Sequence, residues 1–139
     1  MNGKKNLTVE ETFALAVQNH QKNNLQVAKN LYSETLKKNT NYLGANNNLG
    51  VLLGELGEHQ KAISSFEKVI KINPNHVSAR YNLGNTLKEL GEHQKAISSY
   101  EKAIQINPNH VGAHNNLGNT LKELGEHQKA INSYEKVIK

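Results

Sequence analysis

The sequence contains no cysteine, no aspartate and no tryptophan, and it has only two prolines. Without cysteine there is no disulfide framework, no thiolate nucleophile and no cysteine-based zinc site. The chain also lacks an aspartate to orient a catalytic histidine and a phosphate loop of the G-x-x-x-x-G-K type. No stretch approaches the roughly 18 apolar residues of a membrane span, and the N-terminus lacks the apolar run of a secretory signal. These absences predict a cytoplasmic protein that is not an enzyme and needs no cofactor or metal.

The net charge is +5, but the composition weakens any inference from it. Every acidic residue is glutamate, Arg80 is the only arginine, and lysine, asparagine and isoleucine are abundant. An AT-rich genome produces this joint bias, so a single asparagine or lysine is a weak sign of function. Lysine also alternates with glutamate, as in Glu101-Lys102, and stacking aromatics are scarce. We therefore expect neither nucleic acid nor a membrane as the partner.

The chain repeats itself with a fixed period. The segment from Asn82 to Ile97 returns letter for letter from Asn116 to Ile131, and a looser copy begins at Asn48. The first two starting points differ by 34 residues (116 − 82). A period of this size is typical of solenoids, in which small units stack on their neighbours and present an extended surface rather than an enclosed pocket.

Each unit is predicted to contain two helices joined by a glycine turn. Apolar residues recur at spacings of three and four over residues 79–90 and again over residues 96–104, which is the helical period. Gly91 separates the two segments. Pro108 ends the second one, because proline disfavours helix in the residue before it.

The glycines are expected to have two roles. Gly57, Gly91 and Gly125 should each end a helix, since the left-handed conformation is least costly for glycine. Gly84 lies inside a helix, where it costs up to about 1 kcal/mol. We expect it to face Ala96 of the second helix, so that the two helices of a hairpin approach closely.

These motifs resemble the tetratricopeptide repeat, whose pattern is W-x2-L-G-x2-Y, then A-x3-F, then P. The three clear copies carry that spacing at Asn46, Leu49, Gly50, Leu53, Ala62, Phe66 and Pro74; at Arg80, Leu83, Gly84, Leu87, Ala96, Tyr100 and Pro108; and at His114, Leu117, Gly118, Leu121, Ala130 and Tyr134. A degenerate first copy has Ala16 for the glycine and Thr40 for the proline. The bulky residue before Leu-Gly is missing in every copy.

The resemblance implies an all-α fold, a right-handed α-solenoid of tandem antiparallel helical hairpins. The expected divisions are an N-terminal lead-in at 1–8, the degenerate unit at 9–42, and further units at 43–76, 77–110 and 111–139. The first helix should begin with a capping box formed by Thr8 and Glu11.

The last unit stops before its closing proline, and residues 126–139 look as apolar on their outer stripe as internal copies. Repeat arrays usually need a polar terminal unit. We expect the chain to be cut from a longer array; the alternative is that this end packs on another molecule. In both cases the uncapped unit predicts self-association into a homo-oligomer.

The resemblance also implies where a ligand binds, because in this family the first helices of successive units line a concave groove for extended peptides or helices. By period, the groove residues are Asn47, Asn48, Val51, Tyr81, Asn82, Asn85, Lys88, Asn115, Asn116, Asn119 and Lys122, with Phe13 and Val17 in the first copy. An asparagine amide can pair with a peptide backbone without reading its side chains. Biased composition and recent duplication are the competing explanations of the asparagine row.

Two sharper possibilities are disfavoured. A clamp for a chaperone's terminal carboxylate, known in this family, needs lysines where this chain has Phe13 or Tyr81 and Gly44 or Gly112. A metal shared by the histidines that recur once per unit is also unexpected, since packed helices lie on the order of 10 Å apart and zinc ligands about 2 Å from the ion.

The sequence therefore predicts a protein-interaction scaffold with a protein or peptide as its partner. The alternative is the substrate-recruiting array of a larger enzyme, for example a transferase, whose catalytic domain lies outside this chain.

Overall fold

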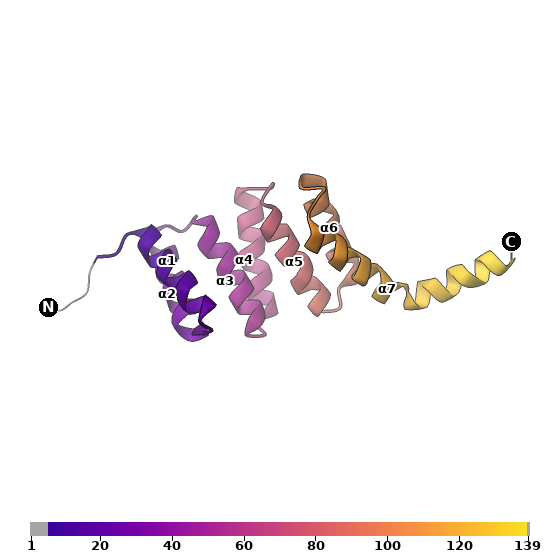
Figure 1. The fold of residues 1–139 in the computed structure, drawn as a ribbon, viewed down its shortest axis with the longest axis horizontal. Coiled ribbons are helices and arrows are strands. Elements are labelled where there is room, and N and C mark those ends of the chain that lie inside the picture. The colour runs from indigo at the N-terminus through magenta and orange to yellow at the C-terminus, as the bar shows by residue number, and fades with distance from the viewer. Residues whose placement is uncertain (1–5, 139) are drawn as a thin grey trace. The chain divides into compact units, whose positions relative to one another are not determined.

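The computed structural model describes the backbone of residues 6–138 and the side chains of residues 6–125, and these residues form helices without strands (Figure 1). The helices are α1 (Val9–Gln21), α2 (Leu25–Lys38), α3 (Leu43–Glu55), α4 (His59–Ile72), α5 (Val77–Glu89), α6 (His93–Ile106) and α7 (Val111–Ile138). The first six alternate between 13 and 14 residues, as two-helix units of constant length require. The predicted all-α helical repeat is confirmed.

The sequence signals for helix ends are also confirmed. The Thr8 hydroxyl accepts from the Glu11 backbone N–H at 3.0 Å, and the Glu11 carboxylate accepts from the Thr8 backbone N–H at 2.9 Å. Gly57 and Gly91 follow α3 and α5 with φ angles of 80° and 77°. In the degenerate first unit the same turn is made by Asn23, with a φ of 64°. Asparagine tolerates this conformation better than most residues, so the turn survives without glycine.

Small residues let the two helices of a hairpin meet around one aromatic ring. A Cβ added at Gly84 would lie 2.6 Å from the Tyr100 ring, and one added at Gly50 would lie 2.5 Å from the Phe66 ring. Tyr100 and Phe66 are both buried. The expectation that Gly84 faces Ala96 is therefore wrong in its partner, since the nearest atoms belong to the aromatic ring one turn further along the second helix. The glycine makes room for a ring rather than for a methyl group.

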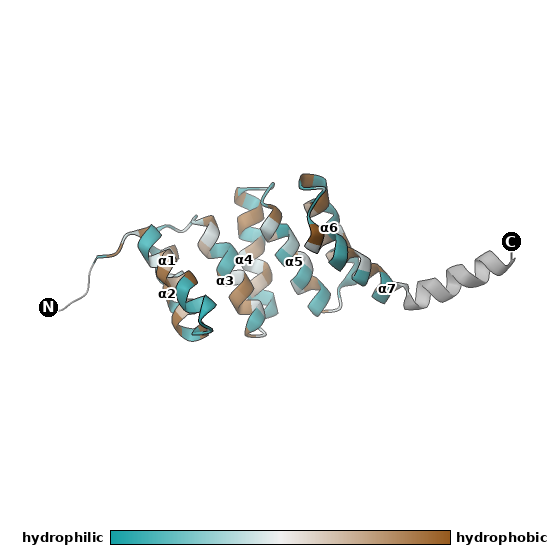
Figure 2. Ribbon diagram, in the orientation of Figure 1, coloured by the Kyte–Doolittle hydropathy of each residue, from teal (hydrophilic) through white to brown (hydrophobic). Residues whose placement is uncertain are grey.

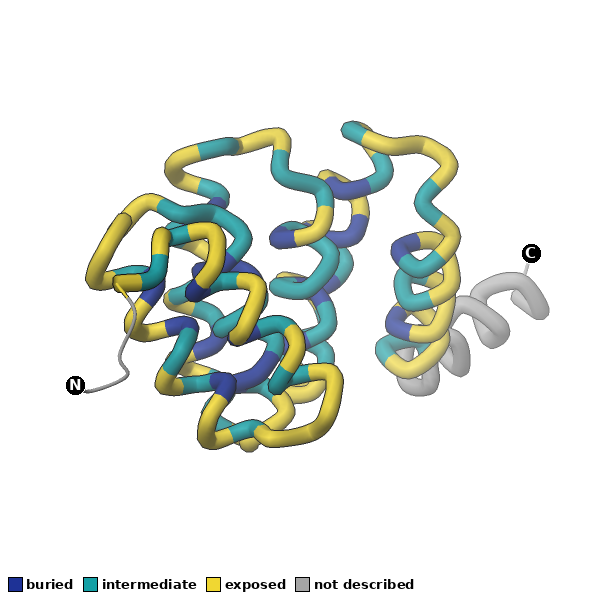
Figure 3. Tube along the Cα trace, turned by 60° about the vertical axis from the view of Figure 1, so that its left-hand side comes forward, coloured by how far each residue is buried: buried dark blue, intermediate teal, exposed yellow. Residues whose placement is uncertain are grey.

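The chain forms two compact units, one ending at Pro74 and the other beginning at Asn75. In the first, α2 lies between α1 and α3, and α4 packs on α3. In the second, α6 lies between α5 and α7. Each helix alternates hydrophobic with hydrophilic positions and buried with exposed ones over the part whose side chains are described (Figures 2 and 3). Every unit thus buries its apolar faces between at least three helices.

The fourth repeat departs from the prediction. Gly125, expected to end a helix as Gly57 and Gly91 do, lies inside α7, which continues for 28 residues to Ile138 (Figure 1). A physical reason lies in the packing. The helix α6 is covered on two sides, by α5 and α7, whereas residues 126–138 would find only the first half of α7 to pack against. A straight helix keeps the backbone hydrogen bonds that a turn would give up. The outer stripe expected on residues 126–139 lies outside the described side chains.

Candidate binding site

The structure places the predicted groove residues in three different settings. Asn47 is buried. The exposed members are Asn115, Asn119 and Lys122. The half-buried members are Asn48, Val51, Tyr81, Asn82, Asn85, Lys88 and Asn116. The half-buried set is the one that can both hold a fixed geometry and reach a ligand.

In the first unit, a buried tyrosine hydroxyl organises the polar groups between α1 and α3. The Tyr32 hydroxyl, from α2, lies 2.8 Å from Nδ1 of His20 and also hydrogen-bonds to the side chain of Asn48. The other ring nitrogen of His20 pairs with the Glu55 carboxylate at the end of α3. One hydroxyl on α2 therefore fixes side chains from the first helices of two successive repeats.

Above this hydroxyl lies an open cleft of about 260 Å³. Its lining residues are Val17, His20, Gln21, Tyr32, Asn48 and Val51. Val17 on α1 and Val51 on α3 are half-buried and provide apolar walls. The floor is polar, because the side chains of His20, Tyr32 and Asn48 meet there. The volume is smaller than that of most small-molecule pockets, about 300–1,000 Å³, and suits one or two side chains.

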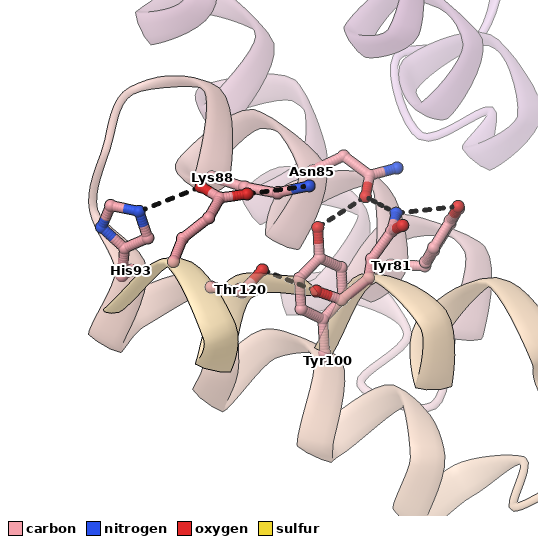
Figure 4. A network of polar contacts seen from close by, with 8 residues as sticks. Tyr81, Asn85, Lys88, His93, Tyr100 and Thr120 are labelled. Atoms are coloured by element: carbon pink, nitrogen blue, oxygen red, sulfur yellow. Dashed lines mark hydrogen bonds and ion pairs between the residues drawn. The ribbon is translucent and has the colours of Figure 1, made fainter. Parts of the chain in front are cut away.

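The second unit builds an equivalent network with more polar members (Figure 4). The Tyr100 hydroxyl donates to Oδ1 of Asn85 at 2.7 Å, and Nδ2 of Asn116 donates to the same oxygen at 2.8 Å. The Asn116 amide also donates to the Tyr81 hydroxyl at 3.2 Å. The asparagine row therefore has bonds inside the protein, from α7 back to the preceding repeat.

The two units are related by 68 residues, and this spacing explains why only one of them has the apolar cleft. Val17 of the first unit corresponds to Asn85 of the second, and Val51 corresponds to Asn119. The Asn85 amide occupies the network around Tyr100, whereas Val17 leaves the Tyr32 hydroxyl to His20 and Asn48. The same framework thus presents an apolar cleft in one unit and amide groups in the other.

A cation on one first helix pairs with a glutamate on the next in both units. In the first unit the pair is His20 with Glu55. In the second, Nζ of Lys88 lies 3.5 Å from Glu123, and Nε2 of His93 lies 3.3 Å from the other oxygen of the same carboxylate (Figure 4). Lys88 was expected to be half-neutralised by neighbouring glutamates. Its partner is Glu123, one repeat further along the chain.

Burial changes the ionisation of both central tyrosines. Their pKa is raised from 10 to about 12, chiefly because the hydroxyl is desolvated. Hydrogen bonds from Asn48 and Asn116 lower the pKa of Tyr32 and Tyr100, and nearby glutamates raise it, but desolvation dominates. Both hydroxyls therefore stay protonated at neutral pH and can donate as well as accept.

Models of one repeat family match the chain over residues 45–139. The descriptions are "Tetratricopeptide repeat" for residues 45–76, 65–98 and 113–139, and "TPR repeat" for residues 84–125. The chain belongs to the tetratricopeptide repeat family. A search of curated proteins found no match.

Solved tetratricopeptide-type structures resemble the chain over most of its length. A crystal structure of MamA is 27% identical with a TM-score of 0.81, covering 94% of this chain and 77% of MamA. The Sgt2 TPR domain from Aspergillus fumigatus is 18% identical with a TM-score of 0.83, covering 91% and 88%. The first TPR of Spaghetti (RPAP3), bound to the HSP90 peptide SRMEEVD, is 16% identical with a TM-score of 0.82, covering 85% and 94%. The last two likenesses concern the fold alone.

The histidines of this tetratricopeptide protein have local roles. His76 and His110 cap the helices that follow them, accepting from the backbone N–H of Ala79 at 3.1 Å and of Ala113 at 3.0 Å. His114, expected as a possible neighbour of His110, instead lies 2.7 Å from the Pro108 carbonyl oxygen. Within the described residues no group of three or more potential metal ligands converges, and none of the helices there combines the length and hydropathy of a bilayer span.

Sequence reasoning missed His20, Gln21 and Tyr32, which complete the cleft of the first unit. One signal could have revealed His20, because it stands 68 residues before Lys88, a residue that was predicted. Tyr32 was noted only as the aromatic position of the repeat motif. That its hydroxyl reaches the groove follows from the packing of α2 between α1 and α3.

The inward bonds of Asn116 predict a stability effect. Asn116→Ala removes the donor to both Asn85 and Tyr81, and we expect a loss of about 1–2 kcal/mol in the free energy of unfolding. Asn115→Ala, next to it on the same helix but exposed, should change stability by less than about 0.5 kcal/mol. Urea unfolding followed by circular dichroism measures both. Equal effects of the two substitutions would show that the network contributes nothing.

Proposed function

We propose that the protein is a peptide-binding scaffold and that the cleft between α1 and α3 holds an apolar side chain of an extended ligand. The observation that carries the proposal is the combination of two valine walls, Val17 and Val51, with a polar floor. A ligand side chain packs between the valines, and the ligand backbone lies along the asparagine side of the cleft.

Asn48 is the proposed contact to the ligand backbone. An amide side chain offers two donor hydrogens and an acceptor oxygen, and the bond to Tyr32 uses only part of that capacity. Because the Tyr32 hydroxyl holds the amide in place, little rotamer freedom is lost when the peptide binds. The same reasoning extends to Asn116 in the second unit, where Asn85 replaces the valine wall and favours polar ligand groups.

The ligand is proposed to differ from an acidic chaperone tail. Where a clamp for such a tail needs lysine, the first unit has Phe13 and Gly44. The Phe13 ring lies 2.8 Å from the position of a Cβ added at Gly44 and 5.0 Å, centroid to centroid, from the Tyr42 ring. A packed aromatic cluster at this place attracts no carboxylate. The peptide SRMEEVD should therefore not bind, and it serves as a negative control.

Selection of short random peptides on the whole protein, followed by titration calorimetry of the winning sequences, tests the proposal. The double variant Val17→Asn/Val51→Asn copies the second unit and should weaken binding at least about tenfold, the loss expected when one apolar side chain loses its pocket. Asn119→Val, on exposed surface of the second unit, is the control and should leave the affinity unchanged. Failure to select any peptide, or equal affinity for the double variant, would contradict the proposal.

A further inference from the structure

The first half of α7 has an uncovered face, which is visible by comparison with its duplicate. Residues 82–97 and 116–131 are identical, yet Leu87 is 7% exposed whereas its equivalent, Leu121, is 49% exposed. The Tyr100 ring fills the space beside Gly84, and nothing lies within 4 Å of a Cβ added at the equivalent Gly118. The other side of this half-helix is covered, because Ala113 and Thr120 are fully buried. Only the place that a second helix of the hairpin would occupy is open.

The chain itself contains a segment that fits this place. In the third repeat the covering helix is α6, and residues 126–138 repeat residues 92–104 except at Asn132 and Val137. Tyr134 stands where Tyr100 stands in the third repeat. Since Tyr100 packs beside Gly84, the matching sequence is complementary to the open face beside Gly118. The occupant of this face is thus defined by sequence.

The same copy of the chain does not supply that occupant. Because α7 is one helix through Gly125, residue 134 follows Gly118 at a distance of roughly 24 Å along the axis, from 16 residues at about 1.5 Å each. We propose that two copies of the protein exchange these segments, so that residues 126–138 of each copy cover the open face of the other. The arrangement is isologous, with the same two surfaces meeting twice around a two-fold axis, and it closes at a dimer.

The exchange explains two features together. It fills the space beside Gly118 and covers Leu121, and it requires no turn at Gly125. The buried apolar side chains drive association, as they drive the packing of α6 on α5. The proposal is independent of the peptide-binding cleft, which lies in the first unit.

Sedimentation equilibrium of the full chain, whose mass is 15.5 kDa, should show a dimer whose population rises with concentration. Gly118→Leu fills the open space and should raise the dissociation constant of the dimer at least about tenfold, because overpacking costs about 1–3 kcal/mol at each of two sites. Glu101→Leu, an exposed substitution of the same chemical kind on α6, is the control and should leave the dimer intact. Only monomer at millimolar concentration, or a dimer indifferent to Gly118→Leu, would overturn the proposal.

A cross-linking experiment identifies the segments that meet. The protein has no cysteine, so Gly118→Cys and Tyr134→Cys each create a single thiol. Mixed under oxidising conditions, the two variants should form a disulfide between unlike chains much faster than either variant forms one with itself. A double variant that closes its disulfide only within one chain would show that the segment folds back on its own helix, and it would overturn the exchange.

Discussion

Gly84→Val is expected to destabilise the second unit by about 3 kcal/mol, because it forces two groups into the space of one. A Cβ at this position lies 2.6 and 2.8 Å from two carbons of the Tyr100 ring. The ring has little room to yield, since Tyr100 is fully buried and its hydroxyl is bonded to Asn85. The gain in helix propensity on replacing glycine, below about 1 kcal/mol, does not offset this overlap.

Urea unfolding measures the effect, with a lower midpoint and an unchanged slope as the expected signature. The chain provides its own control in Gly118, which has the same sequence neighbours but no atom within 4 Å of an added Cβ. In dilute solution, where the chain is monomeric, Gly118→Val should change stability by less than about 0.5 kcal/mol. Similar losses at both positions would show that helix propensity rather than the tyrosine ring sets the cost.

Alkaline pH is expected to unfold the protein through two buried tyrosines. The pKa of Tyr32 and of Tyr100 is raised from 10 to about 12 in the folded state, mainly by desolvation. Below pH 10 both states hold these protons, so the two groups add no pH dependence. Between pH 10 and 12 the unfolded chain releases protons that the folded chain keeps, so stability falls as pH rises.

The expected slope is about 1 kcal/mol per pH unit for each tyrosine, below the limit of about 1.4 kcal/mol per unit for one proton. Urea midpoints measured across this window test it. The double variant Tyr32→Phe/Tyr100→Phe should lose the slope, at a cost near neutral pH of about 1 kcal/mol per lost hydroxyl. Phenylalanine fits this position, since Phe66 is buried at the equivalent place in the second repeat. An unchanged slope in the double variant would assign the alkaline transition to other groups.

Much of the fold follows from local sequence. Thr8 and Glu11 announce the start of α1, Gly57 and Gly91 end α3 and α5, and Asn107 closes α6 before proline. These signals are readable because each depends on contacts within a few residues. The helical period likewise identifies which side of each helix is buried.

The candidate site was predictable only in part. Asn48 and Val51 were identified by period and do line the cleft. Tyr32 and His20 were not identified, because their role depends on one hydroxyl lying between helices of two successive repeats. The asparagine row was expected to face a ligand, and the bonds from Asn116 to Asn85 and Tyr81 could not be anticipated from spacing alone.

The sequence by itself determined the helical hairpin, its period and the residues that a neighbouring hairpin must cover. Only the tertiary structure decided which copies close. The identical segments beginning at Asn82 and Asn116 turn at Gly91 in one repeat and run straight through Gly125 in the other. Local propensity is the same in both, so it cannot make the choice. The difference is that α6 is buried between two helices, and that burial compensates for the backbone hydrogen bonds a turn interrupts.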